Sequence, residues 1–182
     1  MGKAFAAAKR IFAIIETESE INAMEMDKNE SIKKLDIRNV KGHIEFRNVW
    51  FRYPTRKTDF VLRNLSLKVE PGQSIALVGE SGCGKSTFVN LLMRFYDVDS
   101  GEVLLDGINI KEINLYDLRN AVSLVMQEPI IFNYSILENI LYGKLNAKNS
   151  ELQANAEVAN CIEFIEKNDT AIMDDSATNL LK

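Results

Sequence analysis

The spacing of hydrophobic side chains predicts a helix at the start of the chain and a polar linker after it. Residues 2 to about 20 carry apolar side chains at helical spacing, namely Ala4, Phe5, Ala8, Ile11, Phe12 and Ile15. From Thr17 to Asn39 the chain is polar and charged, which predicts a flexible linker. The helix fits two interpretations equally, a surface helix docked on its own domain or the end of a helix that arrives from an upstream region.

Ordered structure is expected to resume at Lys41. From there on, apolar side chains recur at every second residue, as in a strand, instead of at helical spacing. Alternation predicts strands over 43–49 and 60–69, and a Pro54 break follows the first of them. An apolar run predicts a further strand over Ser74–Val78. Residues 103–105 and 108–110 flank Asp106-Gly107, which predicts a hairpin with a tight turn. Residues 121–126 are predicted to form a buried strand.

Helices are predicted over 88–93, 115–119, 135–141 and 150–167. Ser135 followed by Glu138 is a capping box, and Gly143 is expected to end that helix. Ser150 is the predicted N-cap of the last helix, which contains Cys161 as a packed residue. Residues 168–182 show little periodicity.

A phosphate-binding loop lies between the strand predicted over Ser74–Val78 and the helix predicted over 88–93. Its sequence is Gly79, Glu80, Ser81, Gly82, Cys83, Gly84, Lys85, Ser86 and Thr87, which fits G-x-x-x-x-G-K-[ST]. Glycines let the backbone wrap around phosphate oxygens, and the helix start adds partial positive charge there. We expect Lys85 to reach the β- and γ-phosphates and the Ser86 hydroxyl to ligate Mg²⁺.

Composition limits the class of protein. The 182 residues are 46% hydrophobic and 26% charged, as in an ordinary soluble domain. A net charge of −4 argues against a broad nucleic-acid-binding face, so no nucleic-acid partner is expected. The two cysteines, Cys83 and Cys161, suggest no disulfide framework and favour a reducing setting. No segment is long and apolar enough to span a bilayer.

Several segments together resemble the nucleotide-binding domain of ATP-binding cassette exporters of the multidrug-resistance, P-glycoprotein-like branch. The similar segments are 4–15, 40–46, 51–56, 61–67, 71–79, 92–97, 100–107, Met126-Gln127-Glu128-Pro129 with Phe132, and 138–143. The resemblance extends from residue 1 to about residue 166. It implies an α/β fold, a P-loop NTPase core with an antiparallel β subdomain, and an N-terminal helix.

The resemblance implies roles for two more residues. Tyr53 would stack on adenine, although without the family pattern an aromatic at a strand end is more often packed in the core. Gln127 would approach Mg²⁺ and the attacking water as the Q-loop residue. His43, the single histidine, precedes the phosphate loop and so cannot be the family's late switch histidine; we expect a surface strand residue.

The resemblance also implies cofactors, partners and a location. The cofactors are ATP and Mg²⁺, and the partners are exporter transmembrane domains and a second nucleotide-binding domain. The location is the cytoplasmic face of a membrane. Residues 1–38 would be a helix and linker that follow a transmembrane region. Residues 39–182 would be a nucleotide-binding domain that is incomplete at its C-terminal end.

Two features of the family are missing, its L-S-G-G-Q signature and its catalytic Glu. The tail fits two alignments. In one, Asp169-Thr170 matches the segment shortly before the signature; in the other, Asp175 is the Asp of a degraded Walker B motif and Ser176 replaces the catalytic Glu. Under both readings we expect ATP binding with poor hydrolysis, and an apolar edge at Ile75–Val78 that lowers stability. A non-catalytic module that pairs with and regulates a complete cassette domain is the alternative. A separate P-loop kinase or GTPase is disfavoured, because no guanine-specificity motif is present.

Overall fold

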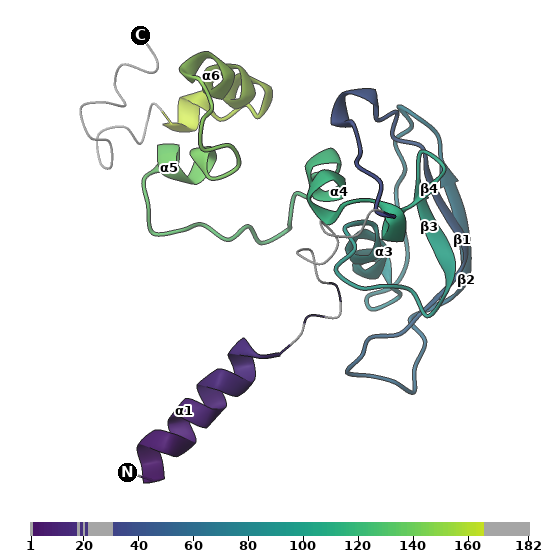
Figure 1. The fold of residues 1–182 in the computed structure, drawn as a ribbon. Coiled ribbons are helices and arrows are strands. Elements are labelled where there is room, and N and C mark those ends of the chain that lie inside the picture. Colours follow the sequence, from purple (N-terminus) through teal and green to yellow (C-terminus); the bar gives the residue numbers. More distant parts are fainter. Residues whose placement is uncertain (1, 18, 20, 22–30, 166–182) are drawn as a thin grey trace. The chain divides into compact units, whose positions relative to one another are not determined.

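The computed structural model describes residues 2–17, 19, 21 and 31–165. The chain divides into two compact units, Met1–Leu124 and Val125–Lys182, and each is described by itself. Helix α1 (Gly2–Ile15) opens the first unit (Figure 1). It confirms the predicted N-terminal helix but ends earlier than expected. Four large apolar side chains near its end, Ile11, Phe12, Ile14 and Ile15, are exposed.

An antiparallel sheet of four strands forms the centre of the first unit. Its order is β2-β1-β3-β4, built from β1 (Ile44–Phe51), β2 (Leu62–Val69), β3 (Ser100–Leu105) and β4 (Ile108–Asn109). Asp106 and Gly107 join β3 to β4 with φ values of 52° and 80°, the left-handed pair of a type I′ turn. The predicted antiparallel β subdomain and its hairpin are therefore confirmed.

One face of this sheet packs against two helices, α3 (Lys85–Leu92) and α4 (Leu115–Ala121) (Figure 1). The rings of Phe46 on β1 and Phe88 on α3 stack with their centroids 4.2 Å apart. Leu91 and Leu118 are fully buried in the same core. Since α3 begins within the phosphate loop, the hydrophobic core fixes the position of that loop against the sheet.

The predicted linker ends earlier than expected, because residues 31–40 already contact the first unit. Lys33 forms a parallel bridge to Ile113, and its ammonium pairs with Glu112 at 2.8 Å. The Leu35 N–H donates to the Asp117 carboxylate at 3.0 Å. The 3₁₀ helix η1 (Ile37–Asn39) follows, and a second one, η2 (Ile110–Glu112), comes after β4. Ordered structure therefore begins before Lys41, and the polar composition of 31–39 reflects an exposed segment with local hydrogen bonds.

Two predicted strands are not formed. Residues 74–78 and 121–126 belong to no ladder among the described residues, and Ala121 is instead the last residue of α4. Val78 is 92% exposed and Val125 is 95% exposed, so the second segment is not buried either. A strand is stabilised by hydrogen bonds to a neighbour. The described part of the chain offers these segments no neighbour.

The second unit contains α5 (Ile136–Leu141) and α6 (Asn149–Val158). The predicted capping box of α5 is confirmed, since Ser135 accepts from the Glu138 N–H and donates its own N–H to the Glu138 carboxylate. The hydrogen bonds that the Ser135 N–H and hydroxyl donate to the Glu138 carboxylate lower the pKa of Glu138. The predicted N-cap Ser150 is wrong, because α6 is capped at Lys148, and Asn160 at φ 52° interrupts the long helix predicted over 150–167.

Within the ranges that the structure describes, no helix combines the length and the apolar character needed to cross a bilayer.

Candidate functional site

The phosphate loop turns into α3 through glycines with left-handed backbone. Gly84 is the N-cap of α3 with φ 99°, and Gly82 has φ 83°. A Cβ atom at Gly84 would lie 2.9 Å from Leu62 Cδ2. The left-handed backbone angle therefore favours glycine at this position, and a larger residue would also have to displace the Leu62 side chain.

The first turn of α3 leaves backbone amides available. The N–H groups of Lys85, Ser86 and Thr87 have no acceptor among the described residues, whereas the N–H of Phe88 already donates to the Gly84 carbonyl oxygen at 3.0 Å. Free amides and the positive end of the helix dipole form an anion site. The backbone of the loop therefore fits phosphate.

Lys85 adds a positive charge at the loop. Its Nζ atom donates to the carbonyl oxygens of Gly79 at 2.8 Å and Glu80 at 2.7 Å, and lies 3.5 Å from Cys83 Sγ. Cys83 is exposed, as are Glu80 and Ser81. The ammonium thus lies against the carbonyl oxygens of the loop, and Lys85 itself belongs to the helix turn that has the free amides.

The two hydroxyl residues that follow Lys85 differ in their surroundings. Ser86 is exposed, and its hydroxyl has no partner among the described residues. Thr87 is buried. The described residues contain no group of three or more His, Cys, Asp or Glu side chains that could hold a metal ion. Mg²⁺ is commonly held by few protein ligands together with phosphate oxygens and water, and Ser86 fits that kind of site.

Tyr53 lies next to the phosphate-loop helix. Its Oη atom is 2.9 Å from Thr87 Oγ1, and Asn90 Nδ2 donates to it at 3.4 Å. The rings of Phe51 and Tyr96 meet the Tyr53 ring nearly at right angles, with centroids 5.0 and 5.1 Å away. The half-buried ring therefore packs against the core and also touches α3. Its stacking on adenine stays a prediction.

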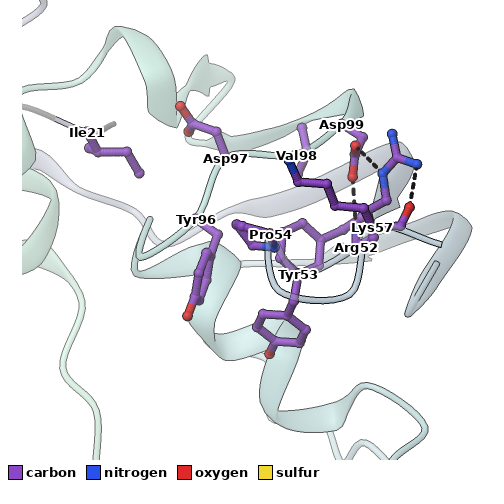
Figure 2. Close-up of a pocket in the computed structure, with 10 residues that line it drawn as sticks. Ile21, Arg52, Tyr53, Pro54, Lys57, Tyr96, Asp97, Val98 and Asp99 are labelled. Carbon is purple, nitrogen blue, oxygen red and sulfur yellow. Dashed lines mark hydrogen bonds and ion pairs between the residues drawn. The ribbon is translucent and has the colours of Figure 1, made fainter. Parts of the chain in front are cut away.

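A pocket of about 550 Å³ lies beside Tyr53 (Figure 2). Pro54 and Tyr96 line it together with Arg52, whose Nε donates to Asp99 Oδ1 at 3.0 Å. No residue of the phosphate loop lines this pocket. Tyr53 lines the pocket and also bonds to α3, so it connects the pocket with the phosphate-loop helix.

Gln127 belongs to the second unit and lies exposed at a bend. The structure therefore groups Tyr53 and the phosphate loop in one unit and leaves the role of Gln127 toward Mg²⁺ a prediction. Asp169, Asp175 and Ser176 lie outside the described residues. His43 precedes β1 at an intermediate exposure, 3.7 Å from Glu70.

Sequence reasoning missed the contacts of Asn90 and Tyr96 with Tyr53. An Asn in a helix and a Tyr after it carry no sequence signal of their own. The stacking of β1 on α3 brings them to Tyr53.

The largest shift in pKa among the described carboxylates lies away from this site. On the sheet face opposite the core, Glu45 accepts from Arg47 at 2.6 Å and from Lys68 at 2.9 Å. These two hydrogen bonds, with that of Arg47 the larger, lower the pKa of Glu45 to about 2. Arg47 also pairs with Glu102 at 2.9 Å. We call these four residues the charged cluster.

Comparison with known proteins identifies the family. A family profile described as ABC transporter matches residues 62–180. Multidrug resistance protein 1 of Entamoeba histolytica is 47% identical over 168 residues, which cover 91% of this chain and 12% of that protein. ABC transporter B family member 21 of Arabidopsis thaliana is 46% identical over 162 residues, covering 89% of this chain and 12% of its own length.

A mouse relative gives the same result. ATP-binding cassette sub-family B member 5 of Mus musculus is 46% identical over 167 residues, covering 90% of this chain and 13% of that protein. The chain thus spans about an eighth of the length of the curated relatives it matches. Together with the helices, the antiparallel sheet and the phosphate loop described above, these matches confirm the expected P-loop NTPase class, and the chain belongs to the ABC transporter family as a nucleotide-binding domain similar to those of multidrug ABC exporters.

Proposed function

We propose that the chain binds Mg·ATP at the phosphate loop Gly79–Thr87. The observation that carries this proposal is that Lys85, whose ammonium lies against the loop carbonyls of Gly79 and Glu80, opens the helix turn whose backbone amides are free. A polyanion at that place meets both a full charge and a helix N-terminus, which are the elements that bind nucleotide phosphates.

Tyr53 would make the site a nucleotide site rather than a site for free phosphate. It is half-buried and bonded to α3, the helix that carries Lys85 and Ser86. A base that stacks on this ring would lie beside the helix whose first turn has the free amides. Stacking on an aromatic ring contributes about 1–3 kcal/mol per base in nucleic-acid complexes.

Three side chains would act on the phosphates, the metal ion and the attacking water. Lys85 would stabilise charge on the β- and γ-phosphate oxygens, and Gln127 would contact the metal and orient the attacking water. Mg²⁺, when bound, neutralises charge between the β- and γ-phosphates. Ser86 would hold the ion through its hydroxyl oxygen.

The larger protein would be a membrane exporter in which ATP binding and hydrolysis drive transport. The printed names of the relatives, which include multidrug resistance proteins, support this part of the proposal. In it, residues 1–38 connect a transmembrane domain to the nucleotide-binding domain that begins at residue 39. A second nucleotide-binding domain is the other partner, and the site faces the cytoplasm.

Retention on immobilised ATP tests the proposal. The wild-type chain should be retained in the presence of Mg²⁺ and released by free ATP. Lys85→Ala should pass through the resin, since it removes the charge that meets the phosphates. Retention of Lys85→Ala equal to that of the wild type would contradict the assignment.

A non-catalytic regulatory module is a second candidate, and one observation favours it. Ile75, Leu77 and Val78 are exposed in a segment of strand composition that has no described partner strand. Such a segment pairs readily with another chain. If the chain regulates a complete cassette domain, the two should co-elute from a sizing column and the ATP turnover of that domain should change upon mixing. Separate elution with unchanged turnover would exclude this role.

A further inference from the structure

We propose that Thr87 is a positioning residue whose side chain acts on the base-stacking ring of Tyr53 rather than on phosphate. This inference rests on the proposed function, in which Tyr53 stacks on adenine. The observation behind it is the hydrogen bond between the Tyr53 and Thr87 hydroxyl groups, whose oxygens lie 2.9 Å apart. This bond joins the segment after β1 to the third residue of α3.

Thr87 is buried, whereas the preceding residue, Ser86, is exposed. Thr87 is only 4% exposed, although both residues lie at the start of the same helix. The Thr87 hydroxyl faces Tyr53 inside the unit, and only its backbone N–H remains available at the helix start. The two adjacent hydroxyls of the loop therefore have different tasks, one toward the metal and one toward the ring.

Asn90 forms a second hydrogen bond with the Tyr53 hydroxyl. Asn90 Nδ2 can only donate, and it lies 3.4 Å from Tyr53 Oη. The Tyr53 hydroxyl thus has two partners, Asn90 and Thr87, and either hydroxyl can donate in the bond between Tyr53 and Thr87. A short chain of hydrogen bonds then runs from Asn90 through Tyr53 to Thr87, and both ends of it lie on α3.

The rest of the ring is held by packing. Phe51 and Tyr96 both contact it with interplanar angles of 78° and 89°, so neither ring is stacked parallel to it. The aromatic neighbours hold the ring in the core while the hydroxyl end is tied to α3. Because Thr87 lies in the first turn of α3 with Lys85 and Ser86, the bond to Thr87 fixes how far the Tyr53 ring lies from these two residues.

This arrangement predicts that loss of the hydrogen bond between Tyr53 and Thr87 weakens binding of the base more than binding of the phosphates. We compare the affinities for Mg·ATP and for Mg·tripolyphosphate, which has the phosphates but no base. In the wild type, ATP should bind more tightly than tripolyphosphate. The ratio of the two affinities should fall about three- to tenfold in Thr87→Val and in Tyr53→Phe, as expected for one net hydrogen bond.

Three further variants make the test specific. Thr87→Ser keeps the hydroxyl and should restore the wild-type ratio. The double variant Thr87→Val with Tyr53→Phe should change the ratio no more than Tyr53→Phe alone, because Tyr53→Phe already removes the hydrogen bond to Thr87. Thr58→Val is the matched control, since the exposed Thr58 hydroxyl contacts only Asp59 among the described residues, and its ratio should equal that of the wild type.

The possible outcomes distinguish the positioning role of Thr87, the stacking by Tyr53 and the binding of ATP. An unchanged or increased ratio in both Thr87→Val and Tyr53→Phe would overturn the positioning role while leaving ATP binding intact. A wild-type chain that binds ATP no more tightly than tripolyphosphate would overturn this role together with the stacking by Tyr53. A wild-type chain that binds neither ligand would overturn this inference and the proposed function together.

Discussion

The Lys85 ammonium lies 2.8 Å from the Gly79 carbonyl oxygen, so the phosphate loop binds its own lysine. A second bond to the Glu80 carbonyl oxygen holds the same ammonium at 2.7 Å. Phosphate oxygens carry more charge than peptide carbonyls and form stronger bonds with an ammonium. An arriving triphosphate therefore competes with these two carbonyls, and the lysine is already near the place where it is needed.

The first prediction concerns the metal. Ser86→Ala should lose the gain in ATP affinity that Mg²⁺ gives, because the exposed Ser86 hydroxyl is the proposed protein ligand of the ion. The measurement is ATP affinity in excess Mg²⁺ and in EDTA for each variant. Ser74→Ala, at an exposed serine just before the loop, is the control and should keep the full effect of Mg²⁺. An undiminished Mg²⁺ effect in Ser86→Ala would remove Ser86 from the metal site.

The second prediction uses the exposed thiol of Cys83. Its Sγ atom lies 3.5 Å from Lys85 Nζ, so an adduct on sulfur would occupy the space of the phosphates. Alkylation with N-ethylmaleimide should block ATP binding, and bound ATP should slow the labelling. The experiment uses a Cys161→Ser background, which leaves one thiol. Equal labelling rates with and without ATP would place the nucleotide elsewhere.

The third prediction separates backbone strain from crowding in the sheet. Gly101 and Gly107 both have left-handed backbone, with φ values of 81° and 80°. A Cβ atom at Gly107 would meet nothing, whereas one at Gly101 would collide with the carbonyl oxygens of Arg47 and Asn48 on β1. Gly107→Ala should cost about 1–2 kcal/mol in unfolding free energy, which is the cost of the backbone angle alone.

Gly101→Ala should cost roughly 1–3 kcal/mol more than Gly107→Ala, as overpacking typically does. Urea unfolding at equilibrium measures both values. The two sites share the backbone angle, so each variant is the control for the other. Equal losses of stability would show that β1 and β3 are not held in the register described, in which Trp50 pairs with Ser100 after a shift.

The fourth prediction concerns acid stability. The pKa of Glu45 is lowered to about 2 from an ordinary value of 4.5. A carboxyl whose pKa is lower in the folded state contributes stability above its unfolded pKa and loses it as the pH falls toward the folded pKa. The contribution of Glu45 should therefore be complete above about pH 4.5 and disappear between pH 4.5 and 2.

Glu45→Gln should remove this part of the pH dependence. Its unfolding free energy should be lower than that of the wild type at pH 7, and the difference should shrink as the pH falls through that window. Glu16→Gln, at an exposed glutamate after α1, is the control. A constant difference between wild type and Glu45→Gln from pH 7 to pH 2.5 would show that the charged cluster does not depend on ionised Glu45.

Local chemistry explains which parts of the structure the sequence could predict. The phosphate loop, the Asp106-Gly107 turn and the Ser135 capping box each depend on residues that are near in sequence, and each forms where expected. The strands predicted over 74–78 and 121–126 are not formed, because a strand depends on neighbours that composition does not reveal. Asn160 ends a helix by adopting a left-handed angle, which asparagine permits but does not require.

The site shows the same division. The Lys85 position follows from its place at the start of a helix after glycines. The bond from Tyr53 to Thr87 joins residues 34 positions apart, and the cluster around Glu45 joins residues on three strands. Such contacts arise from sheet register and from the packing of β1 against α3. They became visible only once the fold was known.

Titration calorimetry with Mg·ATP tests the central claim, that the loop Gly79–Thr87 binds nucleotide. The wild-type chain and Lys111→Ala, at an exposed lysine on η2, should bind Mg·ATP with equal affinity. Lys85→Ala should bind at least about tenfold more weakly, since it removes a charged hydrogen-bond donor to phosphate. Equal affinity of Lys85→Ala and the wild type, or no heat of binding from a folded wild-type chain, would contradict the claim.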